Sequence, residues 1–294
     1  MEPTDTYTLS LVVPCYNEEQ TLSACIERVM ELQSDTLSLE IIIVDDCSSD
    51  DSLEIAHQLA ERYSEIRVLN HEVNRGKGAA LRTGFQYARG DFVGVQDADL
   101  EYEPLQYRDL LVPLIEGEAD VVFGSRYLRT KRRKVLYFWH SWMNKTLTFI
   151  SNMMTNLDIS DMETCYKLFR REVIQSIDLK ENRFGFEPEV VTKVAQMGCR
   201  VWEVAIEYKP RGFDEGKKIG WKDGVHALYC ILHYGAHTAS LPMQLLLYFF
   251  IGAASAVVNI SVFSLLFAMG METSPAVITA FITAAIVNYL LCIA

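Results

Sequence analysis

The chain has 294 residues, of which 50% are apolar and 22% are charged, and its formal net charge is −12. That length allows one large domain or two moderate ones, and the acidic balance argues against a nucleic-acid partner. The seven cysteines are scattered with no Cys-x-x-Cys pair, which favours a reduced compartment over a disulfide framework or a zinc site.

Predicted strands alternate with predicted amphipathic helices in the first part of the chain. The apolar runs 9–13, 39–44, 66–69 and 92–96 are typical of buried strands, and a helical pattern follows each of the first three. Strands that alternate with helices of this length indicate βαβ units. The sequence therefore predicts an α/β fold with a doubly wound, mostly parallel sheet.

Polar clusters end three of these strands, at residues 14–18, 45–50 and 97–101. In a parallel sheet those ends share one edge, and open α/β sheets bind ligands there. Asp97 and Asp99 point the same way if their strand continues through them. The alternative is a solvated turn, because Asp is common in turns.

Carboxylate oxygens are hard ligands, and the acids at 97, 99 and 101 would suit Mg²⁺ or Mn²⁺ together with the phosphates of a substrate. A second polar loop, residues 74–78, places two glycines around Lys77 ahead of a helix. This loop could face a phosphate, although it lacks the Walker spacing.

Two uncharged runs at the end of the chain, residues 241–270 and 273–294, are each long enough to cross a bilayer. We therefore expect a catalytic domain over 1–222, an interfacial amphipathic helix over 223–240 and a membrane module over 241–294. The sequence ends inside an apolar run, so the natural chain is expected to continue.

Basic residues precede the first of these runs, in the segments 126–134 and 209–222. Positive flanks stay on the cytoplasmic side, which predicts a multi-pass membrane protein with a cytoplasmic catalytic domain. The first segment borders an aromatic stretch, residues 135–142, which favours contact with a membrane surface over a solvated loop.

Ordered motifs in this sequence resemble the signatures of family 2 GT-A glycosyltransferases. They are Pro14-x-Tyr16-Asn17-Glu18, Val44-Asp45-Asp46-x-Ser48-x-Asp50, Asn74-x-Gly76-Lys77-Gly78 and Asp97-Ala98-Asp99. Further motifs resemble the subgroup that glycosylates dolichyl or undecaprenyl phosphate. They are Gly124-Ser125-Arg126-Tyr127, the run 161–167 and the run 211–221. The resemblance covers roughly residues 8 to 235, and the apolar runs resemble part of a small four-helix module fused to some members.

The resemblance implies inverting transfer of a hexose from a nucleotide diphosphate sugar, GDP-mannose or UDP-glucose, to a polyprenyl phosphate lipid. It implies that the nucleoside is held by Pro14, Tyr16, Glu18, Val44 and Asp46. It also implies substrate contacts by Lys77 and Ala98, and a diphosphate and metal site at Asp97, Asp99 and Glu101. Better-known members often carry Gln at the position of Glu101.

Several basic positions match phosphate-binding residues of the family. Arg126 falls on such an arginine, and His140 lies where some relatives have another, so Arg132 or Arg133 could substitute for it. Arg211 and Lys217 match residues that close over the diphosphate and acceptor phosphate. The resemblance thus implies catalytic roles for Asp99, Arg126, Arg211 and Lys217.

Glu187 begins a predicted helix and has two equally supported interpretations. It could bind a sugar hydroxyl, or it could be an ordinary first-turn acid that the helix dipole favours.

Three other functions compete with this one. A nucleotidyltransferase would carry a Gly-rich basic loop after the first strand, where this chain has Pro14-Cys15-Tyr16-Asn17-Glu18. A processive polysaccharide synthase would carry Gln-x-x-Arg-Trp, which this sequence lacks. A non-enzymatic scaffold would tolerate loss of the acids, but all are present here. The donor base, the sugar and the oligomeric state, including a homo-oligomer, stay open at this point.

Overall fold

The computed structural model describes residues 6–128, 135, 137–209, 221–236 and 238–293. The chain divides into two units, Met1–Tyr234 and Gly235–Ala294. Helix α8 therefore belongs almost wholly to the first unit. The three-part division at residues 222 and 240 stays a prediction.

A seven-stranded sheet with the order β3-β2-β1-β4-β6-β5-β7 forms the centre of the first unit. Its strands are β1 (Tyr7–Cys15), β2 (Leu37–Asp45), β3 (Ile66–Asn70), β4 (Phe92–Val95), β5 (Val121–Ser125), β6 (Lys167–Arg170) and β7 (Val201–Ala205). All neighbours pair in parallel except β6, which is antiparallel to both β4 and β5. The mostly parallel α/β fold is confirmed.

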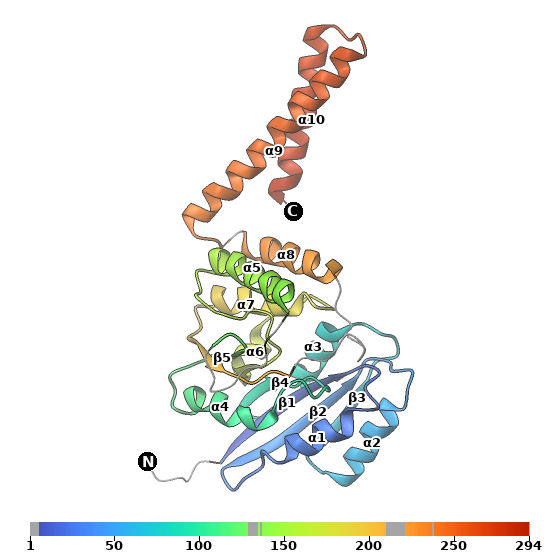
Figure 1. Cartoon of the computed structure of the whole chain (residues 1–294), viewed down its shortest axis with the longest axis vertical. Helices are drawn as coiled ribbons and strands as arrows, with labels where there is room; N and C mark the ends of the chain where they lie inside the picture. The colour runs from blue at the N-terminus through green and yellow to red at the C-terminus, as the bar shows by residue number, and fades with distance from the viewer. Residues whose placement is uncertain (1–5, 129–134, 136, 210–220, 237, 294) are drawn as a thin grey trace. The chain divides into compact units, whose positions relative to one another are not determined.

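Helices connect and cover these strands. They are α1 (Leu22–Met30), α2 (Ser52–Arg62), α3 (Lys77–Tyr87), the short η1 (Pro104–Gln106), α4 (Tyr107–Ile115), α5 (Phe138–Thr155), α6 (Arg171–Ser176), α7 (Phe186–Gln196) and α8 (Trp221–Gly235). The chain moves outward from β1 to β3 through α1 and α2 and then returns to β4 through α3. Right-handed crossovers place α1 and α2 on one face and α3 on the other, and Figure 1 shows α1 and α2 side by side.

The central strands are apolar because the sheet is covered on both faces. The residues from Ile41 to Val44 in β2 are fully buried, as are Leu11, Val12 and Val13 in β1. A parallel sheet buried on both faces needs such continuous β-branched runs, which explains why these strands do not alternate with polar residues. The side chains of α1 at Leu22, Cys25, Ile26 and Val29 cover this core.

The second unit contains α9 (Leu241–Ala268) and α10 (Thr273–Ile293). Within the described residues, both helices are long and apolar enough to cross a membrane. Ala276, Ala280 and Ala284 are buried on one face of α10, where small side chains let two helices approach closely. The side chain of Asn288 donates to Ser255 Oγ at 3.1 Å and adds a polar contact between the two helices.

Candidate active site

The carboxyl ends of β1, β2 and β4 lie side by side at one edge of the sheet. Cys15 of β1 pairs with Asp45 of β2, and Val12 of β1 pairs with Val95 of β4. The three polar clusters that follow these strands therefore leave the sheet at the same edge, as predicted from the sequence.

The loops after β1 and β2 are joined by hydrogen bonds to each other. The main-chain amides of Asn17 and Glu18 donate to Ser48 Oγ at 3.0 Å and Ser52 Oγ at 2.8 Å. In return, the amide of Ser49 donates to the Asn17 side chain at 2.8 Å, and Asn17 adopts a left-handed φ of 53° that Asn tolerates. These residues give the proposed nucleoside edge a fixed shape, and their roles were not identified from the sequence.

The predicted nucleoside contacts differ in how accessible they are. Tyr16 is exposed, and Pro14 and Glu18 are half-buried, whereas Val44 is fully buried inside the sheet. Asp45 belongs to one of the motifs but was assigned no role of its own, and it has a buried Oδ1 with no hydrogen-bond partner among the described residues.

Asp46 organises the loop that precedes α3. Its buried carboxylate accepts from the main-chain amides of Arg75 at 2.9 Å and Gly76 at 2.6 Å, and it lies 2.6 Å from Nδ1 of His71. A carboxylate held by two amides and an imidazole fixes the backbone of this loop. Its contact with a nucleoside stays a prediction.

The glycines of the same loop are required by close packing. Gly76 has a φ of +93°, and a Cβ added there would lie 2.3 Å from the carbonyl oxygen of Asn182. A Cβ at Gly78 would lie 2.4 Å from the carbonyl oxygen of Glu181. The loop therefore packs directly against the segment between α6 and α7, and this approach accounts for both glycines.

The acidic cluster begins beyond the end of β4. This strand ends at Val95, so the premise that it continues through Asp97 and Asp99 is wrong. The chain bends there instead, and Oδ1 of Asp99 accepts from the amide of Glu101 at 3.1 Å. The buried Ala98 lies between the two aspartates, and Tyr208 donates to Glu101 Oε2 at 2.8 Å.

Lys77 joins this cluster to α7. Its Nζ lies 2.9 Å from Oδ1 of Asp97 and 3.3 Å from Oε1 of Glu187. Burial alone would lower the pKa of Lys77, but the charges of Asp97 and Glu187 outweigh it and hold that pKa well above its usual value. A permanently charged ammonium group thus lies between two carboxylates.

Glu187 is only 4% exposed, and its Oε2 has no hydrogen-bond partner among the described residues. An exposed first-turn acid would be solvated. Burial next to Lys77 therefore favours the interpretation that Glu187 serves the site.

Glu163 is a further acid that the sequence analysis did not assign. Its Oε1 is buried without a hydrogen-bond partner in the described part of the chain. Burial, and then the negative charge of Glu187, raise the pKa of Glu163 to about 8. The neighbouring Lys167 is fully buried and donates to the carbonyl oxygens of Met162 at 2.8 Å and Thr164 at 2.5 Å.

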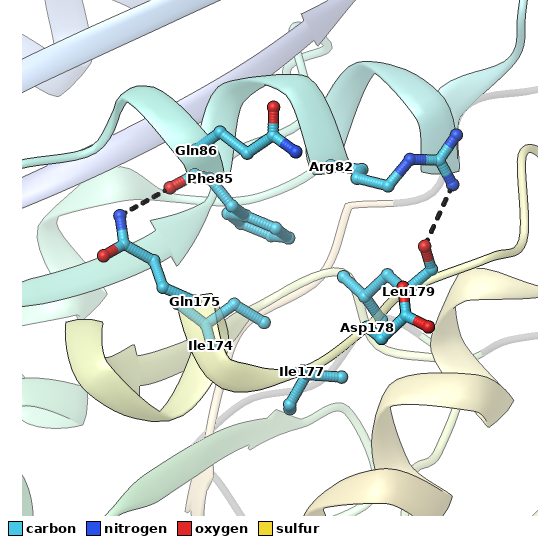
Figure 2. Close-up of a pocket in the computed structure, with 8 residues that line it drawn as sticks. All are labelled: Arg82, Phe85, Gln86, Ile174, Gln175, Ile177, Asp178 and Leu179. Atoms are coloured by element: carbon cyan, nitrogen blue, oxygen red, sulfur yellow. Dashed lines mark hydrogen bonds between the residues drawn. The ribbon is translucent and has the colours of Figure 1, made fainter.

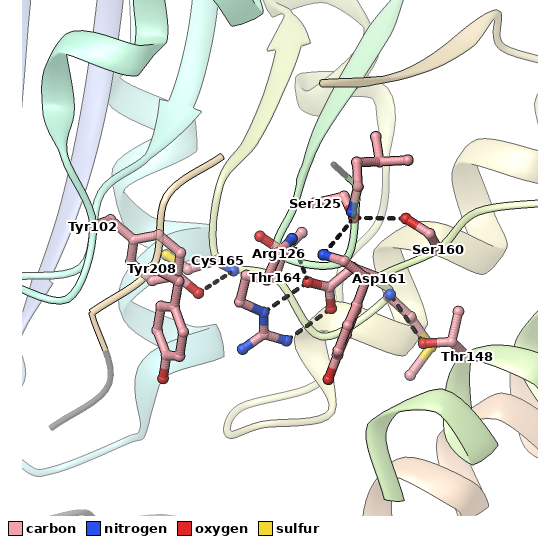
Figure 3. A network of polar contacts seen from close by, with 12 residues as sticks. Tyr102, Ser125, Arg126, Thr148, Ser160, Asp161, Thr164, Cys165 and Tyr208 are labelled. Carbon is pink, nitrogen blue, oxygen red and sulfur yellow. Dashed lines mark hydrogen bonds and ion pairs between the residues drawn. The ribbon is translucent and has the colours of Figure 1, made fainter. Parts of the chain in front are cut away.

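Arg126 forms a buried ion pair with Asp161 (Figure 3). Nε and Nη2 each lie 2.7 Å from the carboxylate oxygens, and the amide of Arg126 donates to Oδ2 at 3.0 Å. The guanidinium carbon also lies 5.1 Å from the ring centroid of Tyr208. Arg126, which the sequence predicts to bind phosphate, is therefore held by the carboxylate of Asp161. The two residues belong to separate motifs, so the sequence did not reveal that they pair.

Of the remaining basic positions predicted to bind phosphate, the structure describes only His140. His140 lies half-buried in the first turn of α5. The predictions for Arg132, Arg133, Arg211 and Lys217 fall outside the described residues.

A cavity of about 300 Å³ between α3 and α6 shares no lining residue with the predicted site (Figure 2). Arg82 donates across it to the carbonyl oxygen of Leu179 at 3.2 Å, and Gln175 donates to that of Phe85 at 2.8 Å. These bonds thus hold α3 to α6 and to the segment that follows α6.

Comparison with known proteins gives a consistent relationship. Residues 10–178 match the family described as Glycosyl transferase family 2. Dolichyl-phosphate beta-glucosyltransferase ALG5A of Trichomonas vaginalis is 31% identical over 221 residues, which are 70% of this chain and 67% of that protein. Glycosyltransferase AglD of Haloferax volcanii is 26% identical over 215 residues, and the chain spans only 33% of its length.

Solved structures show the same fold. Glucosyl-3-phosphoglycerate synthase from Mycobacterium tuberculosis, solved with Mn²⁺, uridine diphosphate and glucosyl-3-phosphoglycerate, superposes with a TM-score of 0.60 at 22% identity. The match covers 78% of this chain and 80% of that one. With a GT-A-like mixed sheet and a family match over more than half its length, the chain belongs to glycosyl transferase family 2.

Proposed function

We propose that this protein transfers a hexose from a nucleotide diphosphate sugar to a polyprenyl phosphate. The observation that carries the proposal is the 31% identity to a relative named dolichyl-phosphate beta-glucosyltransferase. The cluster of Asp97, Lys77 and Glu187 beside the carboxyl edge of the sheet supports it, because charge of both signs is gathered where such sheets bind ligands.

In this reaction the bond between the anomeric carbon and the leaving diphosphate oxygen breaks, and a bond from that carbon to a lipid phosphate oxygen forms with inversion. The lipid phosphate is a monoester with a second pKa of about 6, so it is largely ionised at neutral pH and needs little help from a protein base. The protein must therefore mainly position the substrates and stabilise charge.

The side chains of Asp97 and Asp99 suit a divalent cation, because they are half-buried and offer hard oxygen donors. Glu101, whose carboxylate accepts from Tyr208, would complete this set on binding of the ion, because the three carboxylates do not lie within 4.8 Å of one another in this structure. Mg²⁺ or Mn²⁺ bound there would take up negative charge on the leaving diphosphate. Lys77, already charged and beside Asp97, would add a positive charge to the same region.

Glu187 and Glu163 offer buried oxygens for the transferred sugar. Each has one carboxylate oxygen without a hydrogen-bond partner among the described residues. A buried acceptor without a partner costs free energy of about 1–3 kcal/mol, which a sugar hydroxyl would recover on binding. These two acids would therefore select the hexose by its hydroxyl pattern.

The membrane would present the lipid acceptor. The exposed face of α5 carries Phe138, Trp139, Trp142, Met143 and Phe149, which suit an interface between water and lipid. We expect α9 and α10 to span the bilayer and the catalytic unit to face the cytoplasm, because the basic segments precede the first span.

The test is product formation by the full chain in detergent, with a panel of nucleotide sugars, dolichyl or undecaprenyl phosphate, and Mg²⁺ or Mn²⁺. A lipid-linked hexose from one donor is the expected result, and it would identify the sugar. Chelation of the cation should stop transfer. Failure of every donor, with nucleotide binding intact, would refute the polyprenyl phosphate acceptor.

Asp99→Ala is the decisive variant, with Asp109→Ala in α4 as its control. Asp99 is half-buried in the acidic cluster, whereas Asp109 is exposed on the helix surface. The first substitution should abolish transfer and leave folding intact, and the second should change neither. Retained activity in Asp99→Ala would refute the metal assignment.

A further inference from the structure

A second group of metal-ligating side chains lies outside the site described above. His226 and Cys230 are four residues apart on α8, so they lie on one face of the helix. Glu181 comes from the segment between α6 and α7 and reaches the same face. Its Oε2 lies 2.8 Å from Nε2 of His226, and that nitrogen lies 3.5 Å from Sγ of Cys230.

These three residues differ from an ordinary acidic cluster because they combine a carboxylate, an imidazole and a thiol. Their ligand atoms all lie within 4.8 Å of one another, and in the described part of the chain no other group of three such residues does so. Cys230 is fully buried, and the side chain of His226 is 44% exposed. The group thus has a buried sulfur end and an opening to solvent.

The surroundings fix the orientation of Glu181. Tyr234, one further turn along α8, donates its hydroxyl to Oε1 of Glu181 at 2.9 Å. This bond leaves Oε2 facing His226 and Cys230. Partners of this kind orient the carboxylate ligands of protein-bound metals.

The space beside these ligands depends on a glycine. A Cβ added at Gly185 would lie 2.7 Å from Oε2 of Glu181 and 2.8 Å from Sγ of Cys230. Any larger residue would therefore press on two of the three ligand atoms. Gly185 has a φ of −82°, so no left-handed conformation explains the glycine here.

We propose that Glu181, His226 and Cys230 form a binding site for a soft divalent cation of the zinc class. Zinc accepts sulfur, imidazole and carboxylate ligands in a tetrahedral arrangement, and three protein ligands leave one position for water. This assignment differs from the sequence expectation, in which the scattered cysteines argued against a zinc site. The sequence could not show the site because Glu181 lies 45 residues before His226 and only folding brings them together.

The distances agree with such a site after a small adjustment. In a tetrahedron with the usual zinc bond lengths, sulfur and nitrogen ligands are about 3.6 Å apart, and nitrogen and oxygen ligands about 3.4 Å apart. The observed separation between Cys230 and His226 is 3.5 Å, so this edge is already formed. The hydrogen-bonded pair of His226 and Glu181, at 2.8 Å, would open by roughly half an ångström on binding.

The position of the site gives the cation a structural consequence. The carbonyl oxygens of Glu181 and Asn182 pack against Gly78 and Gly76, on either side of Lys77. A cation at Glu181 would attach α8 to the segment on which this loop rests. We therefore expect it to stabilise the loop that holds Lys77 beside Asp97.

The experiment uses the full chain in detergent, freed of metal by a chelator and titrated with Co²⁺ as a spectroscopic probe. A thiolate ligand gives cobalt a charge-transfer absorption in the near ultraviolet, which carboxylates alone do not give. We expect one equivalent of Co²⁺ to produce this band and Zn²⁺ to displace it. Zn²⁺ should also raise the unfolding temperature of the protein.

Matched variants separate this site from other thiols and from the acidic cluster. Cys230→Ser should remove the band, and His226→Asn and Gly185→Ala should weaken Co²⁺ binding by more than about tenfold. The controls are Cys47→Ser, which removes an exposed thiol, and Asp99→Ala, and both should keep the band. Circular dichroism without metal reports whether each variant is folded.

Absence of a thiolate band in the unsubstituted protein would overturn the proposal. So would a band that persists in Cys230→Ser, or unchanged binding in folded His226→Asn and Gly185→Ala. Those results would leave Glu181 and His226 as a hydrogen-bonded pair that only fastens α8.

Discussion

The ammonium nitrogen of Lys77 lies 2.9 Å from Oδ1 of Asp97, although the two residues follow different strands of the sheet. The same nitrogen lies 3.3 Å from Glu187, so two carboxylates share one cation. Lys77 should consequently matter both for the charge of the site and for its shape.

Lys77→Met should reduce the rate of hexose transfer by roughly 10²–10³-fold, because it removes a fixed positive charge beside the proposed diphosphate site. The measurement is kcat with saturating donor, with the unfolding temperature as a check on folding. Lys77→Arg is the control that keeps the charge, and it should retain more activity. Equal loss in both variants would show that shape, and not charge, limits the reaction.

Arg126→Met should lower the free energy of unfolding by about 3–5 kcal/mol, because it leaves the buried carboxylate of Asp161 without its partner. The pair formed by Arg62 and Glu27 has side chains that are 64% and 52% exposed, so it provides a contrast. Arg62→Ala should change stability by less than about 1 kcal/mol. Chemical denaturation of both variants tests this difference, and similar losses would contradict it.

Gly78→Ala should destabilise the protein by about 1–3 kcal/mol, because the added methyl group would meet a main-chain carbonyl that cannot easily move. Gly224 of α8 is a matched control, since its added Cβ would be 3.8 Å from the nearest atom, Cε of Met143. Gly224→Ala should be neutral or stabilising by up to about 1 kcal/mol through helix propensity. Thermal unfolding of the two variants decides the matter, and an unaffected Gly78→Ala would disprove the packing argument.

Glu163 should make stability fall as the pH rises. Its pKa is raised from 4.5 in the unfolded chain to about 8 in the folded protein, first by burial and then by the charge of Glu187. The stabilising contribution of the bound proton is complete below pH 4.5 and is lost as the pH rises to about 8.

Glu163→Gln should remove this dependence, because glutamine does not titrate. The unfolding temperature of both proteins, measured at intervals between pH 5 and pH 9, tests the prediction. The difference between their pH profiles is at most about 1.4 kcal/mol per pH unit. Parallel profiles would show that Glu163 is ionised throughout.

Much of the fold could be predicted because its signals are local. The apolar runs that became β1 and β2 and the heptad-like spacing of Leu22, Ile26 and Val29 in α1 need no tertiary information. The long uncharged runs that became α9 and α10 are equally direct. The position of the three polar clusters at one edge of the sheet could also be predicted, because parallel strands all end at the same edge.

Tertiary pairing explains what the sequence could not reveal. β6 has only four residues and begins with the buried Lys167, so its pattern did not indicate a strand. The pairing of Arg126 with Asp161 joins positions 35 residues apart, and nothing in their spacing requires it. The spacing of His226 and Cys230 was visible, but only folding brings Glu181 to them.

The antiparallel direction of β6 has a consequence for where this chain can accommodate insertions. β5 ends and β6 begins at the same edge of the sheet, and Phe123 pairs with Lys167 there. The chain between them, residues 126–166, therefore leaves the scaffold and returns beside its point of departure, and the pair of Arg126 and Asp161 closes its base. Insertions inside this excursion that keep the pair at its base would leave the order of the strands unchanged, so its length can vary independently of the sheet.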